Sequence, residues 1–504
     1  MGGGVAVADY NGDGFDDIFF PIMDSFHPES SQKYSSMLWS NNKDGTFTNV
    51  TKETNLGSMN GYPMGAVFFD FDNNGTQDLY VAGYAGGQLF SNQQGTFVDI
   101  TDQAGLNLQG KCGDLPCMTM TAAAADFDKN GYNDLLIINN VSWDIEDSFG
   151  YGLRALLPFA YQSQPIFLFK NNGDGTFEDV SEATGLTNKD VLNNGNDGKG
   201  LSAIWTDLNK DRWPDVYVAN DVTPNRLYIN NQNGSFSEIA TSSGINEWKS
   251  SMGIDAADID HNNTPDMITT NLEGVMVSLY KNQNGYRYIY MTPQLGLIPS
   301  ALGSGWGVLF TDLNLDGHDD LAVANGALAE ELTKKEENKN QFYLNDGDGF
   351  FSLYDPLSHG DNLNHGMSRG MAYLDVMNNG LADLIIANID SAHPQLLVNK
   401  NPDQHHFLRI NLTGTVSNRD AIGAKVTIKR EDGLIQTKEV KAGHSYISSS
   451  SKSLFFGLGT SQIEQLSIKW PSGRTDVFDD IPVNEIITIT EAPKADVTSE
   501  VVIE

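Results

Sequence analysis

Nine residues, DLNLDGHDD at positions 312–320, have the side chains and the spacing to hold a metal ion. Oxygen-bearing side chains stand at positions 1, 3, 5 and 9 of this loop, as Asp312, Asn314, Asp316 and Asp320. Alternate ligands in a tight loop can converge on one point, and Gly317 at position 6 permits the positive φ that such a turn needs. Hard oxygen ligands at this density suit Ca²⁺. The twelfth position is Val323 rather than the bidentate Glu of an EF-hand, so a different kind of calcium loop is indicated.

The same pattern recurs along the chain, so that seven acidic loops share it. The other oxygen-bearing residues are Asp9, Asn11, Asp13 and Asp17 (loop 1); Asp70, Asp72, Asn74 and Asp78 (loop 2); Asp126, Asp128, Asn130 and Asp134 (loop 3); Asp207, Asn209, Asp211 and Asp215 (loop 4); Asp258, Asp260, Asn262 and Asp266 (loop 5); and Asp375, Asn379 and Asp383 (loop 7). Arg212 replaces the glycine in loop 4, and Asn263, a residue type that tolerates the left-handed region, replaces it in loop 5. Met377 stands in loop 7 where a ligand belongs. We expect six complete Ca²⁺ sites and a weak or empty seventh; the alternative is a set of polar turns without metal.

Each acidic loop lies in the same longer pattern of strand-forming segments. An apolar segment with small residues precedes it (TAAAADF), and a second apolar segment follows its last Asp (DLLIIN). A third segment ends in Asn before a glycine hairpin and a fourth segment (LFKNNGDGTFEDV), as is typical of β-hairpins. Four strands per unit of about 50 to 80 residues predict a seven-bladed β-propeller. An open stack of repeats would need capping units, and the sequence shows none.

These patterns resemble FG-GAP repeats of the VCBS type, as in the propellers of integrin α-subunits, over roughly residues 1 to 400. The segments NRDAIGAKVTI (418–428), GHSYISSSSKSLFFGLG (443–459) and IKWPSGR (468–474) are similar to the ASPIC/UnbV domain. The chain thus resembles the cartilage-acidic-protein family of extracellular or cell-envelope propellers. The resemblance implies that positions 1, 3, 5 and 9 of each loop bind Ca²⁺, together with the carbonyl oxygen at position 7.

We therefore predict an all-β chain with two domains. A seven-bladed propeller is expected over residues 1–402, a small β-sandwich of about seven strands with a buried Trp470 over 403–491, and a flexible acidic tail over 492–504. Nearly all of the net charge of −35 lies in the propeller part. Such acidity favours cation binding and argues against nucleic-acid binding, because a phosphate backbone would be repelled. No apolar run of about 18 residues is present, so no membrane span is expected.

The first and last units of the propeller part do not together supply a complete set of strands. The first repeat follows Met1 directly, which leaves no room for a signal peptide, and the seventh unit lacks its own fourth strand. In the FG-GAP pattern that strand comes from upstream of the first repeat. We expect the ring to lack one outer strand, unless residues 405–412 fill it. We also expect the true start to lie upstream, with a secretion signal for an extracellular, periplasmic or cell-surface location.

Strand order sorts the connections onto two faces. The acidic loops and the hairpins between third and fourth strands share one face, named here the loop face. The connections between second and third strands and between blades lie on the other, the insertion face, which receives the long insertions at residues 24–36, 141–165 and 326–340. Variable loops on a rigid scaffold usually carry binding residues, so we expect a protein or glycan ligand there.

Asparagine recurs on the insertion face, five residues after the closing Asp in five of the seven units. These residues are Asn139, Asn220, Asn271, Asn325 and Asn388. One interpretation is a ring of amides lining a polar pocket beside Asp221; the other is that each amide only satisfies backbone groups of its own turn. Cys112 and Cys117 lie on the same face with the spacing of a local disulfide, and two cysteines cannot make a tetrahedral zinc site.

Evidence for catalysis in the sequence is sparse. Loop histidines on the insertion face would suit a transition metal, although scattered loop histidines are usually only polar; they are His27, His359, His365 and His393. No nucleophile elbow, HExxH, P-loop or dinucleotide fingerprint occurs. The main hypothesis is therefore a calcium-binding module for adhesion or binding. The alternative is a secreted enzyme acting on polysaccharide, with loose carboxylate candidates at Asp24, Asp144, Asp147, Asp221 and Asp390.

Overall fold

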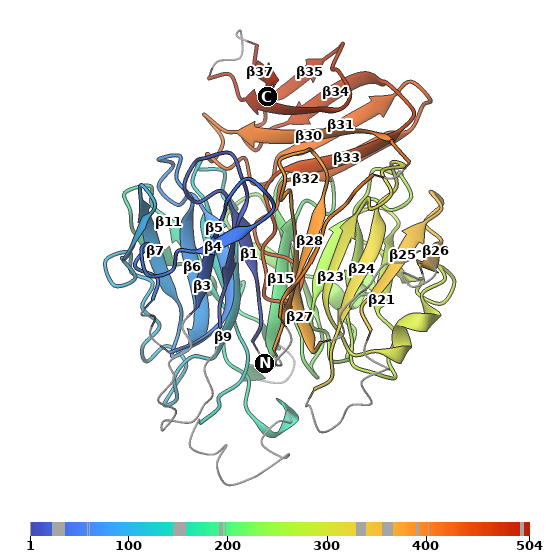
Figure 1. Cartoon of the computed structure of the whole chain (residues 1–504). Helices are drawn as coiled ribbons and strands as arrows, with labels where there is room; N and C mark the ends of the chain where they lie inside the picture. Colours follow the sequence, from blue (N-terminus) through green and yellow to red (C-terminus); the bar gives the residue numbers. More distant parts are fainter. Residues whose placement is uncertain are drawn as a thin grey trace.

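The strands of the first 400 residues form a ring of antiparallel sheets (Figure 1). The computed structural model describes residues 2–22, 36–57, 59, 61–144, 158–190, 195–196, 198–328, 339–354, 366–389, 393–401, 403–493 and 498–503. Within these residues, seven sheets follow one another in chain order, and each carries one acidic loop between its first and second strands. The all-β propeller expected from the sequence is thus the observed fold.

The first three blades are blade 1 with β1 (Ala6–Ala8), β2 (Asp17–Phe20), β3 (Met37–Asn41) and β4 (Phe47–Asn49); blade 2 with β5 (Tyr62–Phe69), β6 (Asp78–Tyr84), β7 (Gln88–Gln93) and β8 (Thr96–Asp99); and blade 3 with β9 (Thr119–Ala125), β10 (Asp134–Asn139), β11 (Phe167–Asn171) and β12 (Phe177–Asp179).

The remaining blades are blade 4 with β15 (Gly200–Thr206), β16 (Asp215–Asn220), β17 (Arg226–Asn230) and β18 (Phe236–Glu238); blade 5 with β19 (Ile254–Ala257), β20 (Asp266–Thr269), β21 (Ser278–Asn282) and β22 (Tyr288–Tyr290); blade 6 with β23 (Gly305–Thr311), β24 (Asp320–Asn325), β25 (Gln341–Asn345) and β26 (Phe351–Tyr354); and blade 7 with β27 (Ser368–Leu374), β28 (Asp383–Asn388) and β29 (Gln395–Leu397). Short elements in the connections are α1 (Ser181–Thr184), α2 (Ala240–Ser243), η3 (Pro158–Ala160), η4 (Ile298–Leu302), β13 (Lys189–Asp190) and β14 (Gly195–Asn196). No described helix is long and apolar enough to cross a membrane.

One asparagine at the end of each third strand links its blade to the blade before it. The Asn92 side-chain amide of blade 2 donates to the Tyr10 carbonyl of blade 1, at 2.7 Å. The same contact with the preceding blade is made by Asn41, Asn92, Asn171, Asn230, Asn282, Asn345 and Asn399. The Asn41 amide donates to the Val376 carbonyl of blade 7, at 2.9 Å, and this bond closes the ring.

Blade 7 has three strands among the described residues, as expected from the missing fourth segment. Residues 405–412 do not fill the gap, because β30 (His406–Thr413) belongs to the second domain, where it pairs with β33 (Leu454–Gly459) and β36 (Glu485–Thr490).

The second domain is a sandwich of two four-stranded sheets. One sheet has the order β33-β30-β36-β37, with β37 at Glu500–Ile503; the other has the order β32-β31-β34-β35, with β31 (Lys425–Arg430), β32 (Ile435–Glu439), β34 (Ile463–Lys469) and β35 (Thr475–Phe478). Trp470 is buried, as expected, and its indole N–H donates to Asp476 at 2.7 Å.

The prediction of a flexible tail over residues 492–504 is wrong for residues 499–503. The β-forming run Glu500–Ile503 pairs antiparallel with β36, and the buried Ser499 contacts Asp476. The charges at the end of the chain suggested a solvated tail, whereas its Val-Val-Ile sequence completes a sheet edge.

The sandwich covers the loop face of the propeller, and the insertion face lies at the opposite end of the ring (Figure 1). Between β32 and β33 the chain leaves the sandwich, and residues 441–451, named here the central segment, enter the middle of the ring. Their backbone pairs with first strands: Ser449 with Ala6, Ala442 with Ala124, and Ser445 with Ile254. Seryl and backbone groups of the segment also bond residues of blades 4, 6 and 7.

Small residues on the first strands make room for this segment. A Cβ atom added to Gly65 of blade 2 would lie 2.9 Å from the Ile447 carbonyl oxygen. A Cβ atom on Gly370 of blade 7 would lie 2.3 Å from the Ser448 hydroxyl oxygen. The central segment therefore contacts all seven blades and fills the centre of the propeller.

Candidate metal loops and the insertion face

All seven acidic loops wrap around the carboxylate of their first Asp. In loop 2, the backbone N–H groups of Asn74 and Gly75 donate to the two oxygens of Asp70, at 3.1 and 2.7 Å. The bond from the position 6 N–H recurs in every loop. Position 6 has positive φ throughout, including Arg212 at 71° and Asn263 at 62°. Position 4 has positive φ as well, even in loop 6, where the residue is Leu315. This second left-handed position was not predicted from the sequence.

The Asp at position 9 ties each loop to the third strand of its blade. Asp78 is fully buried, and its two oxygens accept the N–H groups of Phe71 and Asn92, at 3.2 and 2.7 Å. The same pair of bonds occurs in all seven loops. Burial raises the pKa of Asp78 to about 8. A carboxylate held this way is positioned by the fold itself, and in loop 2 it lies next to the carboxylates at positions 1 and 3.

Three loops bring carboxylate oxygens together within 4.8 Å. They are loops 2, 3 and 5, through Asp70, Asp72 and Asp78; Asp126, Asp128 and Asp134; and Asp258, Asp260 and Asp266. These loops have Asp at positions 1, 3 and 9 with Asn at position 5, whereas loops 1, 4 and 6 have Asn at position 3 and Asp at position 5. In loop 6 the Asn314 amide donates to Asp316 at 2.9 Å, and Asn209 makes the same contact in loop 4. The order of Asp and Asn therefore separates the six complete loops into two groups.

The converging carboxylates fit a hard cation. Burial and neighbouring carboxylates raise the pKa values of Asp70 and Asp258 to about 7. The Asp258 and Asp260 Oδ1 atoms, and that of Asp312 in loop 6, are buried without a hydrogen-bond partner among the described residues. Buried like charges this close are unfavourable unless a cation or protons join them. Oxygen-only donors of this kind match the preference of Ca²⁺.

Loop 7 receives a cation from the protein. Met377 is exposed and offers no ligand. The guanidinium of Arg409, on β30 of the sandwich, donates to Asp375 at 2.9 Å and to Asn378 at 2.7 Å. Both members of the Arg409–Asp375 ion pair are buried. The sandwich thus places a positive charge on the first carboxylate of the one loop that lacks a ligand.

Other basic groups of the sandwich contact the loop face. The Lys425 ammonium lies 3.0 Å from a carboxylate oxygen of Asp207 in loop 4. Lys438 pairs with Asp319, and the Arg430 guanidinium donates to the Asp316 carbonyl at 2.9 Å. The roughly neutral sandwich therefore directs positive charge at the acidic propeller.

The five insertion-face asparagines share one local contact. Each side-chain amide donates to a carbonyl at the far end of its own loop, at 2.7 to 2.9 Å, and the acceptors are Pro165, Pro224, Met276, Lys339 and His393 for Asn139, Asn220, Asn271, Asn325 and Asn388. All but Asn388 are fully buried. These contacts favour the interpretation that each amide closes its own turn, and they do not bring the five side chains together. The reason is geometric, since an Asn at a strand end reaches the returning chain before it reaches a neighbouring blade.

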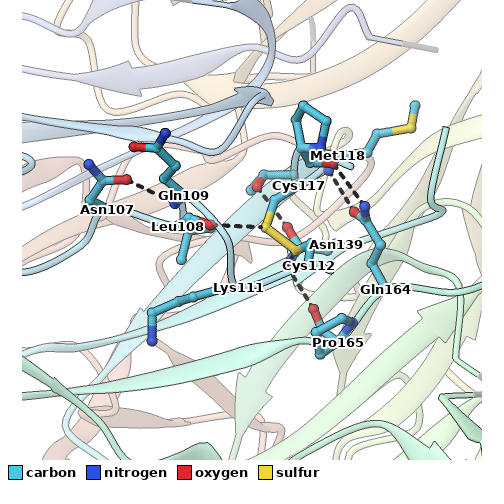
Figure 2. The surroundings of a disulfide bond; sticks show 12 residues. Asn107, Leu108, Gln109, Lys111, Cys112, Cys117, Met118, Asn139, Gln164 and Pro165 are labelled. Atoms are coloured by element: carbon cyan, nitrogen blue, oxygen red, sulfur yellow. Dashed lines mark hydrogen bonds between the residues drawn. A yellow bond between two sulfur atoms is a disulfide. The ribbon is translucent and has the colours of Figure 1, made fainter. Parts of the chain in front are cut away.

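The structure also describes the cysteine pair and Asp221, two further features predicted for the insertion face. Cys112 and Cys117 form a disulfide in the connection between blades 2 and 3, as the spacing predicts (Figure 2). Asn139 lies beside it, with its amide nitrogen 3.8 Å from the Cys112 sulfur. Asp221 is buried, and burial raises its pKa to about 6.

Several of the predicted residues lie outside the described residues. They are Asp24, Asp147, Asp390, His27, His359 and His365, with much of the three long insertions. Of the remaining candidates for catalysis, Asp144 and Asp221 follow second strands on blades 3 and 4, and His393 lies in the second-to-third connection of blade 7.

Comparison with known proteins agrees with this architecture. The FG-GAP-like repeat family matches residues 30–81, 70–137, 207–269 and 312–386, and the ASPIC and UnbV family matches residues 414–496. Cartilage acidic protein 1 of Xenopus tropicalis is 22% identical over 473 residues, which are 81% of this chain and 70% of that protein. The Mus musculus protein of the same name is 20% identical over 478 residues, with the same coverage.

Solved structures align with this chain at low TM-scores. The structure of the Dos1 propeller is 10% identical, with a TM-score of 0.42 over 79% of this chain and 93% of that one. An Agrocybe aegerita lectin that recognises non-reducing terminal N-acetylglucosamine is 14% identical, with a TM-score of 0.41 over 79% and 94%. The family matches carry the assignment: the chain contains FG-GAP-like repeats and a C-terminal ASPIC and UnbV domain, and it is similar to the cartilage acidic proteins.

Proposed function

We propose that this chain is a calcium-binding extracellular or cell-envelope module that binds a protein or glycan ligand through the insertion face of its propeller. One observation carries the choice of face. The sandwich covers the loop face and the central segment fills the middle of the ring, whereas neither of them covers the insertion face among the described residues.

The insertion face also presents large apolar side chains to solvent. Trp248, in the connection between blades 4 and 5, is 74% exposed, and its indole N–H donates to the Val222 carbonyl at 2.7 Å. Ile298 and Leu302 in η4, and Leu328 after β24, are more than half exposed. A tethered indole is a rigid, amphipathic contact surface, and aromatic anchors of this kind dominate protein interfaces.

Two chemical features of the chain support a location outside the cell. The Cys112–Cys117 disulfide suits an oxidising compartment. Calcium sites of extracellular modules have dissociation constants of roughly 10⁻⁴–10⁻³ M, so they are filled where calcium is abundant. We assign Ca²⁺ to the six complete loops, with the oxygens at positions 1, 3, 5 and 9 as ligands.

The test is a binding screen of the Ca²⁺-loaded chain against a glycan array and a panel of extracellular-matrix proteins. For any ligand found, Trp248→Ala should weaken binding at least tenfold and leave the Ca²⁺-dependent melting temperature unchanged. Phe350→Ala is the matched control, because Phe350 is an exposed aromatic residue of a loop-face hairpin. If Phe350→Ala abolished binding and Trp248→Ala did not, the ligand would lie on the loop face and the proposal would be wrong. Release of oligosaccharide products by the same sample would favour the enzyme alternative.

A further inference from the structure

A cavity of about 80 Å³ lies between the propeller and the sandwich, over blades 4 to 7. Its floor includes Asp255 and Tyr373 of first strands, and its roof includes Lys438 on β32 together with Lys441 and His444 of the central segment. A buried water needs about 10–15 Å³ on this measure, so the cavity has room for roughly five to eight water-sized atoms. It lies on the loop face, away from the ligand surface proposed above.

The charges around the cavity are already paired. The Lys441 ammonium lies 2.9 Å from Asp255, Lys438 pairs with Asp319, and Lys425 pairs with Asp207. Burial raises the pKa of Asp255, but the Lys441 ammonium and His444 outweigh it and hold that pKa below its usual value. An added anion would meet the carboxylates of Asp255, Asp319 and Glu439, and an added cation would meet three ammonium groups. A neutral occupant avoids both repulsions.

His444 supplies hydrogen-bonding capacity that the described residues do not use. Its exposed fraction is 3%, and its Nδ1 atom lies 3.5 Å from an Asp255 carboxylate oxygen, an ion-pair contact. Its Nε2 atom has no hydrogen-bond partner among the described residues. A buried polar atom without a partner is unfavourable. A buried ring of this kind in a cavity wall indicates a polar occupant.

The lysines and the apolar walls narrow the chemistry of that occupant. An ammonium group has three N–H donors, and the Lys438 ammonium has one described hydrogen-bond acceptor, Asp319. Hydroxyl groups both donate and accept, so neighbouring hydroxyls can bond the imidazole, the ammonium groups and the carboxylates at once. Phe310, Leu454 and Phe455 form an apolar part of the wall against which a short carbon skeleton can pack.

We propose that this cavity, named the junction site, binds a small neutral molecule with neighbouring hydroxyl groups, held by His444, Lys438 and Lys441. The volume of the cavity fits a small free polyol and is too small for a sugar ring. Such a ligand would contact both domains, and the site exists only where the central segment and the sandwich meet the propeller.

Ligand-observed NMR titration of the Ca²⁺-loaded full chain tests the proposal with named probes. Erythritol represents a polyol of the size of the cavity, methyl glucoside is the oversized control, and acetate and methylammonium represent the charged alternatives. Binding of erythritol in preference to the other three probes would support the proposal. Failure of erythritol to bind, or tighter binding of methyl glucoside, acetate or methylammonium, would overturn it.

Two variants locate the binding. His444→Ala should weaken the binding of erythritol at least tenfold by removing the Nε2 atom that has no other partner. Ala257→Phe should do the same by filling the cavity, and blade 2 already carries an aromatic residue, Phe69, at the equivalent position before its acidic loop. His393→Ala, at an exposed histidine of the insertion face, is the matched control and should have no effect. Ala257→Phe decides the outcome if His444→Ala does not fold, and unchanged binding in a folded Ala257→Phe chain would refute the site.

Discussion

At the scale of single residues, Arg409 and Met377 act as a complementary pair although they lie in different domains. The Met377 side chain removes an oxygen ligand from loop 7, and the Arg409 guanidinium bonds the first carboxylate of the same loop. A buried Asp needs a positive partner whether that partner is a metal ion or a side chain. We therefore expect loop 7 to need no calcium, and the Arg409–Asp375 ion pair links the sandwich to the propeller.

This pairing predicts that Met377→Asp alone does not create a calcium site. The wild type and Met377→Asp should each bind six Ca²⁺ ions, because the guanidinium still bonds Asp375. Arg409→Met alone should destabilise the chain by about 3–5 kcal/mol, the typical cost of breaking one side of a buried ion pair. The Arg409→Met, Met377→Asp double variant should bind a seventh ion and regain stability in calcium.

Equilibrium dialysis and calcium-dependent melting measure both effects. Lys429→Met is the control, since it removes an exposed sandwich cation that pairs with Glu464 away from the loops. Seven ions in the wild type, or a seventh ion gained by Met377→Asp alone, would contradict the pairing.

Asp221 gives a prediction of pH dependence. Burial raises its pKa to about 6 in the folded chain, whereas an Asp in an unfolded chain has a pKa of about 4. Between these values the folded state binds the extra proton, so the free energy of unfolding should fall as pH rises from about 4 to about 6. Asp221→Asn removes this fall in the free energy of unfolding and should stabilise the chain at pH 7 by up to about 3 kcal/mol.

The measurement is the difference in unfolding free energy between the variant and the wild type, taken at pH 5 and pH 7 in saturating calcium. Asp403→Asn, at an exposed position, is the control. A difference that is the same at both pH values would show that Asp221 is not the titrating group.

At the scale of elements, the blades could be predicted because each is specified locally. The acidic loop, the strands beside it and the asparagine at the end of the third strand are all written within one repeat, and their hydrogen bonds recur from blade to blade. The insertion-face asparagines were harder to interpret, because sequence spacing gives the position of an amide but not its acceptor. The order of Asp and Asn in each loop was visible in the sequence. Whether the carboxylate oxygens of a loop converge, however, depends on the side-chain conformations, which the sequence does not give.

The central segment could not be predicted in the same way. GHSYISSSS has neither the alternation of a strand nor the period of a helix and reads as a surface loop, yet the structure buries it. Its partners are far away in the sequence: Ser449 pairs with Ala6 and Ser445 with Ile254. First strands present unpaired backbone groups to the centre of a propeller, as sheet edges do, and glycine and alanine residues on them leave space. Those small residues were the available signal, but they did not specify what fills the space.

At the scale of the whole molecule, the two domains are expected to share their stability. The central segment contacts all seven blades, and sandwich cations bond acidic loops 4, 6 and 7. Calcium in the other loops would offset much of the propeller's negative charge, and its removal would leave acidic loops repelling one another beneath the sandwich. Loss of calcium should therefore weaken both domains together.

The resulting prediction is a large, cooperative response to chelation. At a free concentration about ten times the dissociation constant, each site adds about 1.4 kcal/mol, so six independent sites would add about 8 kcal/mol, comparable with the whole stability of a typical domain. Excess EGTA should lower the melting temperature by on the order of 10 °C, and calorimetry should show one shifted transition rather than two, because the central segment cannot stay in place when the ring opens. Re-addition of Ca²⁺ should restore the transition, whereas equimolar Mg²⁺ should not, since Mg²⁺ demands an octahedral geometry and retains its waters. An unchanged melting curve in EGTA would refute the calcium assignment, and a sandwich transition that stays fixed while the propeller shifts would refute the coupling of the domains.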